Sequence, residues 1–145
     1  MRYFLDTEFN GLGGELISVA LVGEGQFELY VARQCLGPLV PWVEANVRPV
    51  IHAAGAAPVY RTDFWPDIEQ FLMHDPDPVI IADWPDDIAY FCKAMIVGPG
   101  RMIATANQIR FEVHRVDAYP TDLPNAVQHN ALWDARALRR KIMGK

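Results

Sequence analysis

The sequence predicts one mixed α/β domain spanning residues 1–145. Three strand-like runs come first, at residues 2–9, 15–22 and 26–33, and the turn-forming segments NGLGG and GEG separate them. Helical spacing then alternates with short apolar runs for the rest of the chain. A length of 145 residues with 51% hydrophobic residues suits a single compact core. We therefore expect an α/β fold in which a mixed sheet of about five strands carries helices on both faces.

Two helices are expected after the third strand. Residues 38–51 space their valines as a helix does, and Pro49 is expected to end that helix. Residues 62–75 place apolar side chains on one helical face, with Thr62 or Asp63 as the N-cap. These helices would connect the opening strands to the second half of the sheet.

The second half of the chain alternates strands with helices. Residues 77–84, DPVIIADW, form a short continuous apolar run, which indicates a strand covered on both faces. A helix that opens on acids is expected at 86–97, and a further strand within 102–115. The last helix is expected at 131–143, with Asn130 as its N-cap.

Composition argues against several classes of protein. No apolar run reaches the roughly 20 residues that span a bilayer, and a secretion signal is not evident, so we expect a cytoplasmic protein without membrane contact. Cys35 and Cys92 lie far apart without neighbouring ligand patterns, so packed or free thiols are expected. A net charge of −5 argues against broad electrostatic adhesion to nucleic acid. Acids gathered around cations would still permit a nucleic-acid enzyme.

Two acids share one face of the first expected strand. Side chains at positions i and i+2 point to the same side, so Asp6 and Glu8 lie next to each other. Buried like charges are costly unless a cation or a proton intervenes. Two other acid-bearing segments are ADWPDDIAYF and HNALWDARAL. Each has a plainer interpretation, because acids decorate solvated strands and stabilise helix N-termini.

The combination of these segments resembles a known enzyme family. The segment LDTEFNGL, an Asp at the head of a helix after a middle strand, and an H-x-x-x-x-D spacing are similar to the DEDDh group of 3′→5′ exonucleases. This is the RNase T-like and proofreading-exonuclease superfamily, which has an RNase H-like fold. The similarity covers nearly the whole chain in element order, and the first two strands look most like those of small bacterial exoribonucleases. The matching residues are Asp6, Glu8, Gly11, Leu12, His129 and Asp134.

The middle motif departs from the family pattern. Family members commonly show N-x-x-F-D, whereas this chain reads Asp83-Trp84-Pro85-Asp86-Asp87. The spacing places Asp87 at the metal-binding position, Asp83 at the Asn and Asp86 at the aromatic residue. Asp87 is the preferred ligand, and Asp86 and Asp83 stay open as alternatives.

The resemblance implies a two-metal catalytic centre. Its catalytic residues would be Asp6, Glu8, Asp87, Asp134 and His129. The four carboxylates would hold two Mg²⁺ ions, for which Mn²⁺ can substitute, at a separation of about 3.5–4 Å. Asp6 would bridge both ions. His129 would act as the general base on the attacking water.

The implied activity is hydrolysis of RNA from its 3′ end, single-stranded or overhanging, with release of nucleoside 5′-monophosphates. Thr7, Phe9 and Leu12 would bind the terminal nucleotide, although Phe9 could equally pack under the sheet. Such RNA-processing nucleases are often homodimers, and the tryptophans Trp42, Trp65 and Trp84 suit either an interface or a core. The basic residues of the last helix complement its dipole or, alternatively, steer phosphates; they are Arg136, Arg139, Arg140 and Lys141.

Three other functions stay open at this point. A 3′→5′ DNA exonuclease would use the same residues, since no residue here can be shown to contact a 2′-hydroxyl. A non-catalytic nucleic-acid-binding module could share the fold, although the complete set of acids with His129 argues against it. A phosphoaspartyl hydrolase also begins with a strand and two acids, but it usually needs D-x-D and a downstream Lys.

Overall fold

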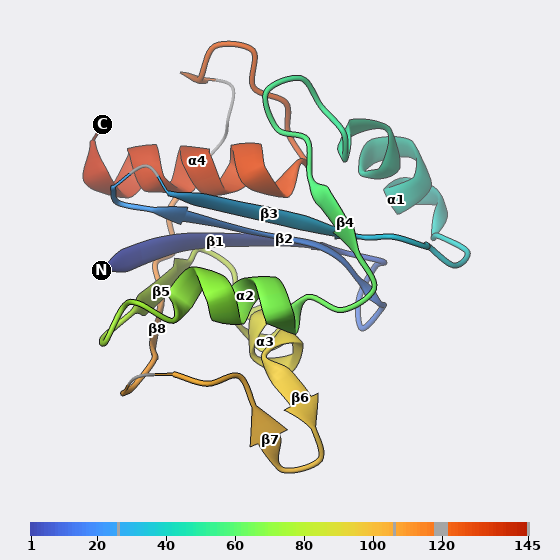
Figure 1. Cartoon of the computed structure of the whole chain (residues 1–145). Coiled ribbons are helices and arrows are strands. Elements are labelled where there is room, and N and C mark those ends of the chain that lie inside the picture. The colour runs from blue at the N-terminus through green and yellow to red at the C-terminus, as the bar shows by residue number, and fades with distance from the viewer. Residues whose placement is uncertain (26, 106, 118–121, 145) are drawn as a thin grey trace.

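A computed structural model describes residues 1–25, 27–105, 107–117 and 122–144. Among these residues, six strands form one sheet in the order β4-β3-β2-β1-β5-β8 (Figure 1). The strands are β1 (Arg2–Phe9), β2 (Leu16–Gly23), β3 (Glu28–Arg33), β4 (Val59–Arg61), β5 (Val79–Ala82) and β8 (Arg110–Val113). β1, β2 and β3 form an antiparallel meander, whereas β5 runs parallel to β1 and β8 parallel to β5. The predicted mixed α/β sheet is therefore confirmed, with one more strand than expected.

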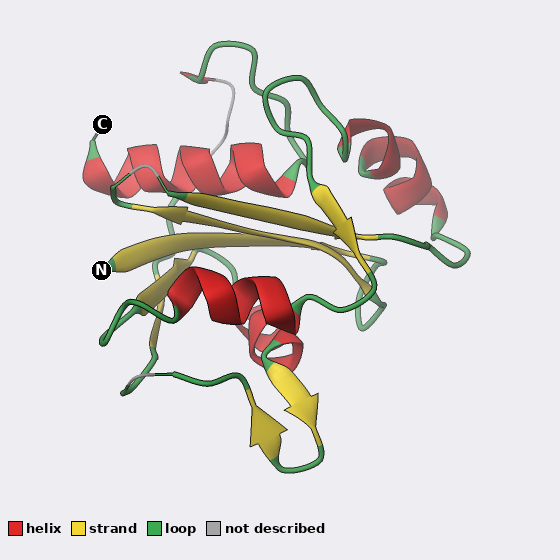
Figure 2. Ribbon diagram, in the orientation of Figure 1, coloured by secondary structure: helices red, strands yellow, loops and turns green. Residues whose placement is uncertain are grey.

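Helices cover both faces of this sheet, as the sequence predicts (Figure 2). In Figure 1, α4 lies along one face, and α2 and α3 lie against the other. The helices are α1 (Pro41–Asn46), the 3₁₀ helix η1 (Arg48–Val50), α2 (Trp65–Leu72), α3 (Pro85–Ala94) and α4 (Ala131–Met143). A separate hairpin pairs β6 (Ile96–Gly98) with β7 (Arg101–Met102).

Side chains of β1 alternate between the two faces and divide the core. Leu5 packs on the α2 and α3 side, in a cluster with Ile68 and Phe91. Phe4 packs on the α4 side, in a cluster with Leu138. Each of these side chains is almost completely buried, and burial of each contributes about 1.5–3 kcal/mol. The central strand is thereby fixed between two layers, so the residues that follow Leu5 are also fixed in direction.

Several predicted boundaries are wrong. Pro49 does not end the helix: α1 ends at Asn46, and Pro49 lies in the first turn of η1, where proline needs no N–H. The N-cap of α2 is Phe64, not Thr62 or Asp63, because Pro66 suits a helix that begins at Trp65.

Other boundaries shift by less. The run predicted as helix through residue 97 ends at Ala94, and the chain then turns into β6. β3 begins at Glu28, and residue 26 of the third predicted strand lies outside the described residues. Strand β4 has no counterpart in the sequence prediction, since its three residues are all exposed and show no alternation.

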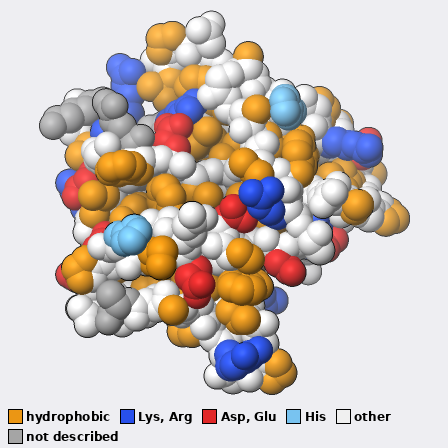
Figure 3. All heavy atoms as spheres, in the orientation of Figure 1, with side chains coloured by type: hydrophobic (Ala, Val, Ile, Leu, Met, Phe, Trp, Pro, Cys, Tyr) orange, Lys and Arg blue, Asp and Glu red, His pale blue; other side chains and the backbone are white. Residues whose placement is uncertain are grey.

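The distribution of basic side chains on the surface is consistent with the net charge of −5. On the face shown in Figure 3, Lys and Arg side chains are scattered among hydrophobic and neutral ones and do not gather into one patch. Both cysteines are free thiols, with Cys35 exposed and Cys92 half-buried. Over the described residues, no helix combines the length and apolar character needed to cross a bilayer.

Candidate active site

The two acids of β1 point to the side of the sheet on which α4 lies. Alternation along the strand puts Asp6 and Glu8 on the same face as Phe4, which packs against Leu138 of α4. Both acids sit at the carboxyl end of β1, and the chain leaves the strand after Phe9. The strand therefore presents the pair of carboxylates toward the first turn of α4.

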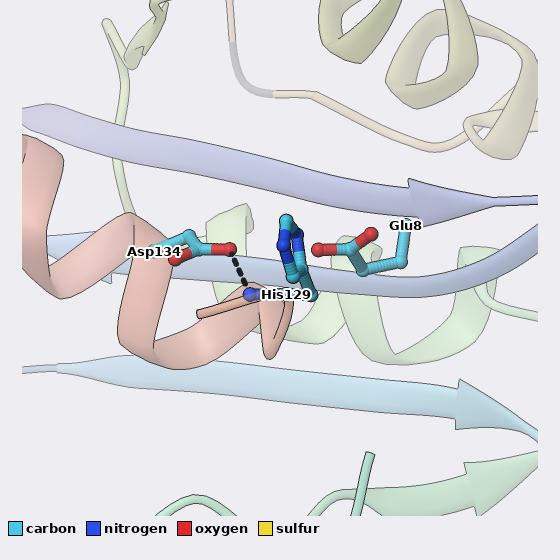
Figure 4. Close-up of side chains that lie close together, drawn as sticks. All are labelled: Glu8, His129 and Asp134. Carbon is cyan, nitrogen blue, oxygen red and sulfur yellow. Dashed lines mark hydrogen bonds between the residues drawn. The ribbon is translucent and has the colours of Figure 1, made fainter. Parts of the chain in front are cut away.

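The N-terminus of α4 brings a histidine and a third carboxylate to Glu8. The backbone N–H of His129 donates to Oδ2 of Asp134 at 3.0 Å. In Figure 4 the imidazole of His129 lies between the carboxylates of Glu8 and Asp134. One potential ligand atom from each of these three residues lies within 4.8 Å of the others. The predicted H-x-x-x-x-D residues therefore meet the β1 acids in space.

Asn130 fixes the backbone beside His129. It is the predicted N-cap, and its Oδ1 accepts from the N–H of Trp133 at 3.1 Å. Its buried Nδ2 donates to the carbonyls of Val50, Ile51 and Ala56 at 2.9–3.2 Å. His129 itself adopts a left-handed conformation, with φ of 64°. A non-glycine residue holds this conformation only where its surroundings impose it.

The N-terminus of α3 brings the fourth carboxylate. Asp87 is buried, with 3% of its surface exposed. Its Oδ1 accepts from both the backbone N–H and the hydroxyl of Thr7, at 3.2 and 2.5 Å. Thr7 lies on the opposite face of β1 from Asp6, so α3 and β1 are joined at this point.

The other two acids of the middle motif behave differently from each other. Asp83 joins Asp6 and Asp87 in a second group whose potential ligand atoms lie within 4.8 Å of one another. Asp86 instead accepts from the indole N–H of Trp84 at 3.3 Å, in an exposed contact. Asp87 and Asp83 thus reach the site, whereas Asp86 belongs to neither group of potential ligands among the described residues.

The acids disfavour one another's charged forms. Burial, followed by the charges of Asp87 and Asp134, raises the pKa of Asp6 well above its usual value. Burial raises the pKa of Asp87 to about 7, although the hydrogen bond from Thr7 opposes the shift. Burial also raises the pKa of Asp134 to about 7, against the hydrogen bond from the His129 backbone. Glu8 has a raised pKa for the same reason, because it is buried close to Asp134.

One oxygen in this cluster has no partner in the protein. Oδ2 of Asp6 is buried and accepts no hydrogen bond from the described residues. A buried carboxylate oxygen without a donor costs free energy unless a cation or a proton satisfies it. Hard divalent cations bind carboxylate oxygens, and the donor set here is carboxylates with one imidazole. The residues therefore suit Mg²⁺ or Mn²⁺.

The histidine of the site differs from the acids in its protonation. Burial lowers the pKa of His129, which favours the neutral imidazole near neutral pH. This ring packs nearly perpendicular to that of Trp42, with ring centroids 4.9 Å apart at 81°. Trp42 is half-exposed, so it closes one side of His129 while its other side faces solvent.

The loop after β1 contains the remaining predicted site residues. Leu12 is 95% exposed at the tip of this loop. The side chain of Asn10 anchors the loop, because it donates to the Pro38 carbonyl and accepts from the Val40 N–H. Gly14 passes so close to the Asn10 carbonyl that a Cβ there would lie 1.8 Å from the oxygen. The loop is therefore fixed at its base and exposed at its tip.

Phe9 packs against a residue that the sequence prediction missed. Its ring stacks on Tyr90, with centroids 4.4 Å apart, and the Tyr90 hydroxyl donates to the carbonyl of Gly14. Tyr90 also lines a cavity of about 250 Å³ with Leu12 and Lys93. Because Tyr90 lies one helical turn after Asp87, helical periodicity could have placed it near the site. No local sequence pattern could have placed Trp42 at the site, because its contact partner His129 lies in a distant segment of the chain.

Two of the four basic residues of α4 are engaged within the protein. Arg136 pairs with Glu28 at 2.7 Å and stacks over the ring of Trp133. Arg139 donates to the carbonyl of Glu24 at 2.9 Å. These contacts favour a structural role for both arginines.

Comparison with known proteins adds no family to this geometry. A scan against protein-family models finds no match, and a search of curated proteins finds none either.

Proposed function

We propose that this protein is a divalent-cation-dependent 3′→5′ exoribonuclease of the DEDDh type, with an RNase H-like fold. One observation carries the proposal: Asp6, Glu8, Asp87 and Asp134 lie close enough for their charges to act on one another, His129 lies in one group with Glu8 and Asp134, and Oδ2 of Asp6 has no partner among the described residues. The element order and the mixed sheet support the same conclusion.

The four carboxylates would hold the cations. Asp6, Glu8 and Asp134 come from β1 and α4, and Asp87 comes from α3. When bound there, two Mg²⁺ ions would supply charge neutralisation for the phosphodiester, for the attacking water and for the departing oxygen. Thr7 positions Asp87 through its two hydrogen bonds, and His129 positions Asp134 through its backbone N–H.

His129 would act as the general base. Its neutral form accepts a proton at a ring nitrogen as the water oxygen attacks phosphorus. The bond from phosphorus to the 3′-oxygen of the preceding nucleotide breaks, that oxygen takes up a proton from solvent water, and His129 then releases its own proton to solvent. The products are a nucleoside 5′-monophosphate and an RNA one nucleotide shorter. Asn130 and Trp42 restrict the position of the imidazole during this step.

The loop after β1 suits recognition of a chain end. Leu12 projects from a loop whose base is held by Asn10, so it can contact a terminal base without rearrangement of the strand. Apolar contact of this kind tolerates any base identity. The preference for RNA and the expected homodimer rest on the resemblance to small exoribonucleases.

The burial of the acids argues against a non-catalytic binding module. A module that only contacts nucleic acid gains nothing from raised carboxylate pKa values, and negative charge repels phosphates. A centre that binds cations explains both the burial and the unpartnered Asp6 oxygen.

The proposal can be tested by digesting oligonucleotides labelled at the 5′ end. Single-stranded RNA, RNA with a 3′ overhang, and DNA of the same sequence are incubated with Mg²⁺, Mn²⁺ or EDTA. We expect a ladder that shortens from the 3′ end of RNA, release of nucleoside 5′-monophosphates, and no cleavage in EDTA. Internal cuts would reject the exonuclease mode, and faster loss of DNA would identify a DNA exonuclease.

A matched pair of histidine variants isolates the general base. His129→Ala should lower kcat by roughly a hundredfold or more, because general-base catalysis contributes about 10²–10⁴. His52→Ala is the control, since His52 lies in an exposed contact with Tyr60 outside both groups of potential ligands. Equal activity of the two variants would contradict the assignment of His129.

A further inference from the structure

We propose that Asp83 is a fifth carboxylate of this metal centre and ligates the cation held between Asp6 and Asp87. The inference rests on the proposed function, because it assumes that the centre binds divalent cations. In the family pattern an Asn stands at this position, so the extra carboxylate would be a property of this chain.

The strand register places Asp83 beside Asp6. β1 and β5 are parallel neighbours, and Phe4 is the partner of Ile81. Two residues after this pair come Asp6, still within β1, and Asp83, one residue past the end of β5, and continued alternation puts both on the same face as that pair. Phe4 and Ile81 share one buried cluster with Leu138 of α4. The same alternation therefore directs both acids to the α4 side, and their oxygens lie within 4.8 Å of each other and of Asp87.

An unpartnered oxygen lies in this second group. Oδ2 of Asp6 is buried without a hydrogen bond from the described residues, whereas Oδ1 of Asp87 is already occupied by Thr7. A cation between Asp6, Asp83 and Asp87 would satisfy that oxygen. The donors are all carboxylate oxygens, which are the ligands that Mg²⁺ and Mn²⁺ prefer.

Among the described residues, no side chain donates a hydrogen bond to the Asp83 carboxylate, and its contacts are with its own backbone and the charge of Arg115. The N-cap position of α3 is Trp84, and no side chain caps this helix. Arg115 donates to the backbone carbonyl of Asp83 at 2.6 Å, and its guanidinium stacks over the ring of Trp84. The guanidinium of Arg115 therefore bonds the backbone and an aromatic ring, and it acts on the Asp83 carboxylate only through its charge.

A fifth carboxylate changes the charge of the centre. Asp6, Glu8, Asp83, Asp87 and Asp134 carry five negative charges when ionised, against four positive charges on two divalent cations. Asp83 should therefore tighten cation binding, and it should make the cation-free protein less stable through like-charge repulsion. A variant without the Asp83 charge should therefore bind the cation more weakly and, in the absence of cations, be at least as stable as the wild type.

The test is calorimetric titration of the full-length protein with Mn²⁺ alone. We expect the wild type to bind two Mn²⁺ per chain. Asp83→Asn should weaken one of them by about tenfold or more and leave the other within about threefold, because charge-bearing ligands dominate such sites. Asp86→Asn is the matched control, since Asp86 contacts Trp84 outside the site, and both affinities should stay unchanged. Asp83→Glu should restore much of the lost affinity.

Folding is checked separately, so that a misfolded variant cannot imitate the result. In EDTA, Asp83→Asn should have an unchanged far-UV circular dichroism spectrum and an equal or higher Tm. If Asp83→Asn does not fold, Asp83→Ser removes the same charge with a smaller side chain and should show the same weakening. Wild-type affinity for both ions in either variant would overturn the role of Asp83 and leave the proposed function intact. A wild type that binds no Mn²⁺ would overturn both.

Discussion

Acids at the two ends of the β1–β5 pair have opposite environments. Asp77 precedes β5, and its pKa is lowered by hydrogen bonds from Arg110 and then Gln108. Asp6 and Asp87 lie at the other end, where burial and neighbouring acids raise their pKa values. At the first end the chain supplies its own counter-charge. At the second end, no basic side chain of the described residues forms an ion pair with Asp6 or Asp87, and this difference is the reason for proposing that a cation binds there.

The largest expected effect is a loss of activity when one of these acids is neutralised. Asp6→Asn should lower kcat by about a thousandfold, as expected for removal of a preorganised charge at a reacting phosphate. Asp77→Asn is the matched control and should keep activity within about twofold, because it breaks only an exposed ion pair. Digestion of 5′-labelled RNA in Mg²⁺ measures both variants. If Asp6→Asn and Asp77→Asn lost activity equally, the assignment of a catalytic role to Asp6 alone would be contradicted.

The next effect concerns the stability of the cation-free protein against pH. Between about pH 4 and about pH 7 the folded protein holds protons on Asp87 and Asp134 that the unfolded chain has released. The free energy of unfolding should therefore fall as pH rises through this window. In EDTA we expect Tm at pH 8 to lie on the order of 5 °C below Tm at pH 5.5.

Excess Mg²⁺ provides the control for this pH effect. Cations satisfy the ionised carboxylates, so the difference in Tm between the two pH values should shrink when Mg²⁺ replaces EDTA. A higher Tm at pH 8 than at pH 5.5 in EDTA would show that the acids are not held near their neutral forms.

A smaller effect is expected at the hydrogen bond that positions Asp87. Thr7→Val removes the hydroxyl donor, which raises the pKa of Asp87 further. At neutral pH the Mg²⁺ concentration for half-maximal activity should rise by about tenfold, because one lost hydrogen bond is worth about 1.4 kcal/mol. The difference should narrow at higher pH. Thr7→Ser keeps the hydroxyl and should behave as the wild type.

The smallest effect is expected at the end of the β1–β5 pair where Asp77 forms an ion pair with Arg110. Arg110→Gln breaks the exposed pair with Asp77 and should leave the free energy of unfolding nearly unchanged, because solvent screens an exposed ion pair. Urea denaturation of the variant and the wild type in the same buffer measures it. A large decrease in the free energy of unfolding would mean that the ion pair stabilises this end of the sheet.

The sequence predicted the parts of the fold that local signals define. The alternation in β1 placed Asp6 and Glu8 on one face, and Asn130 was found as the N-cap of α4 because capping is a matter of neighbouring residues. The apolar run of β5 indicated burial on both faces, which the structure confirms. Periodicity and caps are short-range properties, so they can be read without tertiary contacts.

Long-range contacts could not be predicted. Trp42 and His129 pack with their rings nearly perpendicular although more than half of the chain separates them, and no spacing within either segment indicates this pair. β4 pairs with β3 through three exposed residues, which carry no hydrophobic pattern. Spacing alone left Asp83 and Asp86 as equal alternatives, and only the strand register and the Trp84 contact separate them.

The buried amide of Asn130 links helix initiation to the loop at residues 50–56. Three carbonyls of that loop share this donor, and the first turn of α4 depends on the same side chain. Any local opening that frees the loop must therefore also fray the helix, and the two segments should exchange their amide protons with deuterium as one cooperative unit. The geometry of the histidine then lasts only as long as that unit stays closed.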